Sequence, residues 1–308
     1  HVPQCSACGV TLILHKKPAR LVCSYCGQTH IPPVKCSSCQ STRLEPSGFG
    51  TERLEEMVQE QFPRSKVARF DREVVKTTKE ETVLLERFKH GNVNILIGTE
   101  LLFHGPTMPR ADFVGIPYAD GGLHIPDFRS SERSYRLLEQ TIGLAASSDQ
   151  HSLTAEVVLQ TYLPMHHVIQ AAVQRDARIF YEQELGFREA LGYPPFTHLI
   201  QMAISGKHHD RVELAAKRCR DLLVGGVKKA GGAPPLSHEG QIEGENILGP
   251  ISSLRPRSPG ISRYVMVIKC RQLDRSRQLV QAVREELGLA LRRERMTLEV
   301  NVDPLEIL

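Results

Sequence analysis

The pattern of apolar and polar residues predicts an α/β region in the middle of the chain. Helices are expected over residues 51–61, 78–90 and 130–145. In the first of these, Leu54, Met57 and Val58 follow the i, i+3, i+4 spacing of an amphipathic helix, and Gly91 suits the C-terminal cap of the second. Short apolar runs predict strands over residues 66–71, 94–99, 113–120 and 156–162. Alternating helices and buried strands are typical of a parallel sheet.

The pattern changes after about residue 165 and predicts a smaller α+β unit. Helices are expected over residues 166–191, 210–224 and 274–292, and strands over residues 198–206, 263–270 and 297–304. This order favours a sheet with helices on one face. A Gly- and Pro-rich segment, residues 225–246, is expected to be a loop between the two halves.

Composition limits the class of protein but does not identify a partner. The chain has 308 residues, 41% of them hydrophobic, which is enough for two modest cores and a small module. The formal net charge of +4 is too small to indicate nucleic acid by itself. No 18-residue apolar run or signal peptide is present, so we expect a soluble, cytoplasmic protein without a membrane partner. Because the chain starts with His1, we expect it to be part of a longer polypeptide.

The cysteines give the strongest chemical signal. Six of the eight form three CxxC pairs, which are Cys5 and Cys8, Cys23 and Cys26, and Cys36 and Cys39. Two such pairs complete a tetrahedral zinc site, and we expect the first two pairs to form one. A disulfide framework is the alternative, but it suits small secreted proteins. The third pair lacks two ligands, which is either a defect or a sign that another pair precedes His1.

Small and charged residues follow the predicted parallel strands, at the edge where open sheets bind ligands. Gly98-Thr99 follows one strand and suits a phosphate oxygen, although such a pair is often only a turn. The segment Asp127-Phe-Arg-Ser-Ser-Glu-Arg133 follows the next strand. Its Arg129 and Arg133 suit phosphates, or they are a solvated helix start.

In this order, the motifs resemble those of the PriA family, the primosomal replication-restart DNA helicases. The shared features are a cysteine-rich module, GTE, ILIGT, DFRSSER, QTY-x-P, Tyr193-Pro-Pro-Phe196, a Leu-Gly-Pro turn at 248–250 and a terminal Val302-Asp-Pro304. They span essentially the whole chain. The resemblance implies two interleaved zinc sites, with Cys36 and Cys39 belonging to the second.

Three departures from the family pattern affect the expected activity. Where the family has Gly-Arg-Ala-Gly-Arg, this chain has Gly143-Leu-Ala-Ala-Ser147, so both phosphate-binding arginines are absent. A family lysine is replaced by His104, and no G-x-x-x-x-G-K-[ST] motif occurs. Loss of such an arginine slows phosphoryl transfer by about three to five orders of magnitude. We therefore assign no catalytic residue and expect no ATP hydrolysis by this chain alone.

The basic loop before the predicted strand at 263–270 is a second candidate DNA contact. It holds Arg255, Arg257 and Arg263 next to Tyr264. A short charge run is as often a solvated surface, but the resemblance implies a C-terminal domain that binds branched and single-stranded DNA.

The resemblance predicts three parts: a zinc-binding module (residues 1–45) inserted in a parallel-sheet, RecA-like second helicase lobe (46–165), and an α+β DNA-binding domain (166–308). The predicted function is a replication-restart factor that binds forked or single-stranded DNA and nucleates primosome assembly. Other primosome proteins and single-strand-binding protein are the implied partners. The alternatives are an ATP-dependent 3′-5′ DNA helicase, which would need ATP, Mg²⁺ and an upstream lobe, and a zinc-ribbon scaffold that binds only protein.

Overall fold

The computed structural model describes most of the chain and divides it into two compact units. The described residues are 3–6, 11–16, 19–23, 27–36, 39–43, 50–103, 108–145, 155–229, 247–253, 260–305 and 307. Unit 1 comprises His1–Leu44, His124–Ser130 and Glu182–Leu308, and unit 2 comprises Glu45–Leu123 and Ser131–Tyr181.

The first half of unit 2 follows the predicted order of helix and strand. Its elements are α1 (Thr51–Gln61), β4 (Val67–Phe70), α2 (Thr78–Lys89) and β5 (Ile95–Gly98). Strands β4 and β5 pair in parallel. Thr77 and Glu80 form a capping box at the start of α2, and Gly91 adopts a φ of 70° after its end. Phe70 and Leu85 are in the small core of this half.

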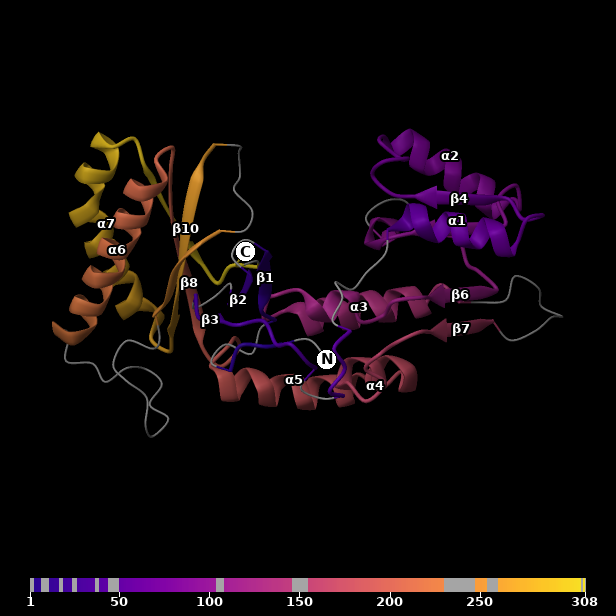
Figure 1. Cartoon of the computed structure of the whole chain (residues 1–308), viewed down its shortest axis with the longest axis horizontal. Helices are drawn as coiled ribbons and strands as arrows, with labels where there is room; N and C mark the ends of the chain where they lie inside the picture. The colour runs from indigo at the N-terminus through magenta and orange to yellow at the C-terminus, as the bar shows by residue number, and fades with distance from the viewer. Residues whose placement is uncertain are drawn as a thin grey trace. The chain divides into compact units, whose positions relative to one another are not determined.

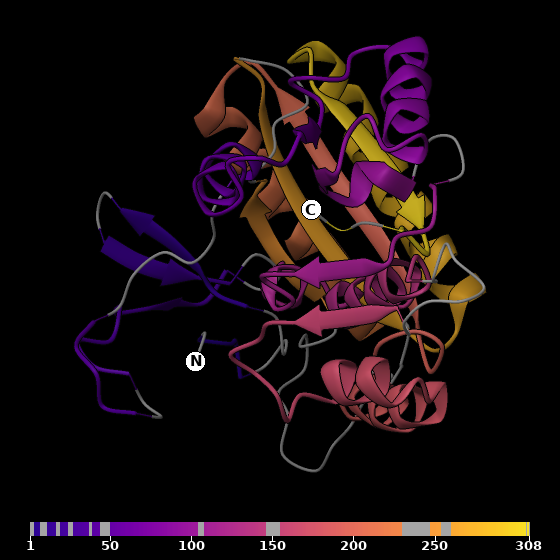
Figure 2. The ribbon, with the colours of Figure 1, turned by 90° about the vertical axis from the view of Figure 1, so that its right-hand side faces the viewer.

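The second half of unit 2 contains a separate parallel pair of strands. Its elements are β6 (Phe113–Ile116), α3 (Ser130–Ile142), β7 (Glu156–Leu159), α4 (His167–Gln174) and the start of α5 (Ala177–Leu191), with short 3-10 turns at Glu100–Phe103 and Gly121–His124. Figure 2 shows β6 and β7 side by side and parallel. Parallel pairing was predicted correctly, but the described strands form two sheets of two strands rather than one sheet.

The predicted helix over residues 166–191 is two helices. Arg175 adopts the left-handed conformation with a φ of 51° and ends α4. The backbone N–H of Arg178 then donates to Oδ1 of Asp176, which gives α5 a capped start. The sequence lacks a Gly or Pro at this break, so hydrophobic periodicity alone did not reveal it.

A four-stranded antiparallel sheet forms the centre of unit 1. The strand order is β11 (Thr297–Val302), β8 (His198–Gly206), β10 (Ser262–Cys270) and β9 (Ile247–Ser252). Helices α6 (His209–Lys229) and α7 (Leu273–Arg293) lie side by side against one face, as Figure 1 shows. This agrees with the predicted α+β arrangement, although β9 was not predicted. Met202, Met266, Leu223 and Leu287 are central residues of the core between sheet and helices.

The opposite face of the same sheet is also buried, largely by the cysteine-rich region. Leu199 of β8 and Val267 of β10 pack in one cluster with residues far away in sequence, which are Cys5, Leu12, Leu21, Cys23, Phe128, Tyr193 and Ile307. Because both faces are covered, β8 and β10 are buried along almost their whole length instead of alternating between buried and exposed residues. The strands β1 (Ile13–Lys16), β2 (Ala19–Val22) and β3 (Thr29–His30) form a small antiparallel sheet in this region.

These contacts group residues 1–44 with the C-terminal sheet, whereas the sequence predicted a module inserted in the α/β lobe. The three-part division at residues 45 and 165 stays a prediction. In the described part of the chain, no helix is both long and apolar enough to cross a membrane.

Candidate zinc and nucleic-acid sites

The first two CxxC pairs each place their leading cysteine in the interior of unit 1. Cys5 and Cys23 are 2% and 0% exposed and belong to one buried cluster. The Sγ of Cys5 also lies 3.6 Å from Oε1 of Gln28, next to the second pair. Their predicted partners Cys8 and Cys26 lie outside the described residues. The fold therefore brings together the two described members of the predicted four-cysteine site.

The second and third pairs have the same local turn geometry. The N–H of Gly27 donates to the carbonyl of Cys23 at 3.0 Å, and the N–H of Gln40 donates to that of Cys36 at 2.9 Å. Both residues that follow the pair are left-handed, with φ of 77° at Gly27 and 59° at Gln40. A glycine adopts this conformation without steric cost, which suits Gly27 to its position after the second pair. A tight turn of this kind allows both cysteines of a CxxC pair to bind one ion.

The described residues fit zinc chemically, but they contain only part of any ligand set. Cys36 is buried and Cys39 is exposed. Among the residues that the structure describes, no three His, Cys, Asp or Glu side chains gather at one point. Complete sets would include Cys8 and Cys26, which are not among those residues. Cysteine thiolates held in tight turns beside a small antiparallel sheet are typical ligands of structural zinc sites.

An acidic residue fixes the start of α1 in unit 2. Asp71, just after β4, accepts a hydrogen bond from the hydroxyl of Thr51 at 2.6 Å and others from the N–H groups of Glu73 and Val74. The Nε of Arg69 lies 3.2 Å from it. Burial alone would raise the pKa of Asp71, but these hydrogen bonds and the Arg69 charge outweigh it and lower the pKa. This network joins the GTE segment to the strand end.

The Gly98-Thr99 pair lies at the carboxyl end of β5, as predicted. A Cβ on Gly98 would lie 2.7 Å from the Leu102 side chain, so the turn leaves no space for one. The Thr99 side chain is exposed, and its hydroxyl accepts from the N–H of Leu101 at 3.4 Å. Thr99 is thus accessible to a ligand, but its role in phosphate binding stays a prediction.

A fully buried acidic residue lies beyond the end of β6. Asp120 accepts hydrogen bonds from the hydroxyl of Thr161 and, at 2.7 Å, from the N–H of Tyr162. These two residues follow β7 in the QTY segment. The structure therefore joins the segment after β6 to the QTY motif, which is one of those that carry the family resemblance.

The DFR and YPPF motifs meet in a stack of aromatic and cationic side chains within unit 1. The rings of Phe128 and Tyr193 are parallel, with centroids 5.0 Å apart. The guanidinium groups of Arg129 and Arg188 lie 5.3 and 5.5 Å from the Phe128 centroid. The Nζ of Lys269 lies 3.7 Å from the Tyr193 centroid. These motifs therefore have a structural role, since cation–π contacts and stacking stabilise a core.

Sequence reasoning did not find Lys269 in this stack, or Glu184, which pairs with its Arg188. Lys269 is 5% exposed and donates to the carbonyl of Leu191 at 2.8 Å. Glu184 is 6% exposed and accepts from Nε of Arg188 at 2.9 Å. A lysine inside the apolar run YVMVIKC was the available signal, because a buried charge requires a partner.

The predicted phosphate-binding arginines differ in their surroundings. Arg129 is half-buried in unit 1, and its Nε has no hydrogen-bond partner among the residues that the structure describes. Arg133 is half-buried in unit 2. Arg263 has a side chain only 10% exposed and pairs with Glu299 at 2.7 Å. Arg255 and Arg257 lie outside the described residues.

The segment that replaces the family's arginines packs locally in unit 2. Gly143 accepts a hydrogen bond from Arg110 at 2.7 Å, and the carbonyl of Leu144 accepts one from Ala111. Ser147 and His104 lie outside the described residues.

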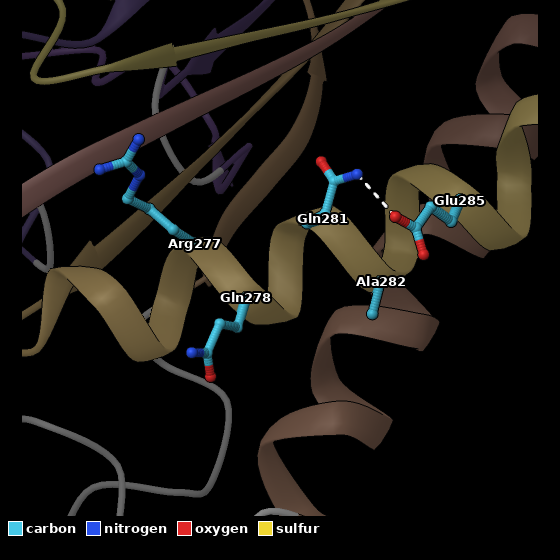
Figure 3. A pocket seen from close by; sticks show the side chains of 5 residues that line it. All are labelled: Arg277, Gln278, Gln281, Ala282 and Glu285. Carbon is cyan, nitrogen blue, oxygen red and sulfur yellow. Dashed lines mark hydrogen bonds between the residues drawn. The ribbon is translucent and has the colours of Figure 1, made fainter.

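An open hollow lies along the outer surface of α7. Figure 3 shows the five side chains that line it, which are Arg277, Gln278, Gln281, Ala282 and Glu285. The amide of Gln281 donates to the Glu285 carboxylate at 2.7 Å, one turn further along. The hollow contains none of the residues predicted from sequence.

Two models of known protein domains match parts of this chain. The "PriA DNA helicase Cys-rich region (CRR) domain" matches residues 5–30, and the "Primosomal protein N C-terminal domain" matches residues 189–305. The Cys-rich model is a zinc ribbon, which suggests zinc.

Full-length relatives extend the match over nearly the whole chain. Replication restart protein PriA of Treponema pallidum is 32% identical over 99% of the chain, which spans 43% of that protein. The Bacillus subtilis protein of the same name is 31% identical over 99% of the chain and 36% of its own length. The chain therefore spans less than half of these relatives. With both domain models and the order of motifs in agreement, this chain belongs to the PriA family of replication restart proteins.

Proposed function

We propose that this chain binds forked or single-stranded DNA and nucleates primosome assembly during replication restart. The observation that carries the proposal is the combined match of the Cys-rich region and the C-terminal domain, continuous with 32% identity to a replication restart protein. Other primosome proteins and single-strand-binding protein are the proposed protein partners, and the cytoplasm is the proposed location.

Zinc is the proposed structural cofactor. Cys5, Cys8, Cys23 and Cys26 would hold one ion, and Cys36 and Cys39 would contribute to a second. Cys5 and Cys23 are buried, and Gly27 and Gln40 close matching turns with hydrogen bonds to Cys23 and Cys36, which supports this assignment. A bound zinc would fix the cysteine-rich segment against the sheet, because the ligands lie on separate stretches of chain.

Phosphate contacts are the proposed basis of DNA affinity. The proposed contacts are Gly98, Thr99, Arg129, Arg133, Arg255, Arg257 and Arg263. Since Arg263 already pairs with Glu299, we expect it to contribute less than the other arginines. About four neutralised phosphates give a double-logarithmic salt slope near −3 on single-stranded DNA, at roughly −0.7 per phosphate.

Fluorescence anisotropy with forked, single-stranded and duplex oligonucleotides tests this proposal. Replacing Arg255 and Arg257 together by Ala should flatten the slope by about one to one and a half units. A matched control replaces Arg211 and Arg218, two exposed arginines of α6, and should change the slope less. If wild-type protein shows no binding at low salt, the DNA-binding proposal is wrong.

The alternative function is ATP-dependent 3′-5′ unwinding by this region joined to an upstream helicase lobe. The name of the matching Cys-rich model, which includes DNA helicase, favours it. For this chain alone we expect no DNA-stimulated ATPase activity, because it lacks the G-x-x-x-x-G-K-[ST] motif and has Leu144 and Ser147 in place of arginines. ATP turnover that Thr99→Ala abolishes would contradict this expectation.

A further inference from the structure

The loop between β7 and α4 presents two large apolar side chains to solvent. This loop, residues 160–166, contains Tyr162 and Met165, which are 79% and 83% exposed. Single exposed apolar side chains are common on proteins and need no explanation. What distinguishes this loop is that its backbone is tightly held while these two side chains remain outside.

Buried polar groups hold the first part of the loop. Asp120, which is fully buried, accepts from both the Thr161 hydroxyl and the Tyr162 N–H. The Thr161 oxygen in turn accepts from the N–H of Leu163 at 2.9 Å. The backbone on both sides of the Tyr162 side chain is therefore fixed by a carboxylate in the interior.

The second part of the loop is held by the start of α4. The Gln170 side chain donates to the carbonyl of Pro164 at 2.6 Å, and the N–H of His166 donates to the carbonyl of Leu163 at 3.0 Å. The ring of His166 accepts from the N–H of Val168 at 3.3 Å. Because the loop is ordered in advance, a ligand that docks on Tyr162 would restrict little more than the side chain itself.

The loop lies at the carboxyl ends of strands β6 and β7, the edge at which α/β sheets bind ligands. Strands β6 and β7 run parallel, and both Asp120 and Tyr162 follow their carboxyl ends. Ligands of α/β sheets bind at this edge.

We propose that Tyr162 stacks against an unpaired base of single-stranded DNA. This inference rests on the proposed DNA-binding function and names one contact that provides it. An aromatic ring on a fixed loop matches a base, because every base has a π-face. Two exposed side chains are too few to form a stable protein interface, which covers about 800 Å² per partner. Met165 adds a polarizable apolar surface from the same loop.

A fluorescence experiment detects the contact directly. The chain contains no tryptophan, so Tyr162→Trp introduces a single tryptophan reporter. We expect oligo-dT to quench its emission upon binding. The control is Tyr181→Trp in α5, where the native tyrosine is 57% exposed, and we expect little quenching there.

Affinity measurements at constant salt test the energetic role of the contact. Tyr162→Ala should weaken oligo-dT binding by roughly 5- to 150-fold, the range for one stacked base, while Tyr162→Phe should stay within about twofold. An abasic oligonucleotide of equal length has the same phosphates and no bases. Wild-type protein and Tyr162→Ala should bind it equally.

The outcomes separate this inference from the proposed function. If no oligonucleotide binds wild-type protein at low salt, both are wrong. If oligo-dT binds with the expected salt slope but Tyr162→Ala has unchanged affinity, only the stacking inference is wrong. An equal loss by Tyr162→Ala on oligo-dT and abasic DNA would also overturn it.

Discussion

Replacing Phe128 by Ala should destabilise unit 1 by about 3–5 kcal/mol, as expected for truncating a buried phenylalanine. The Phe128 side chain is 8% exposed and stacks on Tyr193 at 5.0 Å. Arg129 and Arg188 also face its ring. Of this loss in stability, about 0.5–1.5 kcal/mol comes from the interaction between the Phe128 and Tyr193 rings. Phe128→Leu should cost less than Phe128→Ala, since it retains most of the volume but loses the ring.

Native-state hydrogen exchange of β8 and β10 amides is the suitable assay, because it reports on the opening of unit 1 alone. Phe187→Ala is the matched control, since the native ring is 54% exposed and belongs to the same unit. It should change stability by no more than about 1 kcal/mol. A loss below about 1 kcal/mol in Phe128→Ala would refute the argument that the DFR motif is part of the unit 1 core.

Three further predictions concern other parts of the molecule. Asp71→Asn should destabilise unit 2 by about 1–3 kcal/mol at pH 7 in urea unfolding. Because the folded pKa of Asp71 is lowered, its contribution is complete above about pH 4 and is lost as the pH falls through the folded pKa, so the difference from wild type should shrink there. Gly249→Ala should cost more than about 2 kcal/mol in thermal unfolding, since Gly249 has a φ of 86° and a Cβ would lie 2.6 Å from the Val265 carbonyl oxygen. Chelation of zinc should make the CxxC cysteines reactive to iodoacetamide, as mass spectrometry would show, while Cys219 stays unreactive because burial raises its pKa to about 12.

Local signals predicted the regular elements where they agreed with tertiary packing. Helix α1 covers the predicted residues, because its apolar spacing is clear and Pro63 follows it. Strand β9 was missed, because Gly249-Pro250 is a turn signal. Proline is tolerated in an edge strand, and β9 lies at the edge of its sheet.

Contacts between distant segments were beyond the reach of local patterns. Phe128 and Tyr193 belong to motifs that the sequence places far apart, and no periodicity indicates that their rings stack. The same holds for Asp120 and Tyr162, which follow different strands. The candidate residues were found by chemistry and resemblance, but only the fold shows that several of them act first as structural residues.

The cysteine-rich region and the C-terminal sheet share one core, which changes how zinc would act. Cys5 and Cys23 lie in the same buried cluster as Leu199 and Val267, on the sheet face opposite α6 and α7. Zinc ligation would therefore stabilise the packing of the cysteine-rich region against that sheet face, as well as the small ribbon itself. Leu199 and Val267 require such a cover, because exposed apolar side chains on a sheet face are unfavourable in water. Metal binding and the stability of the C-terminal sheet are thus expected to be thermodynamically coupled.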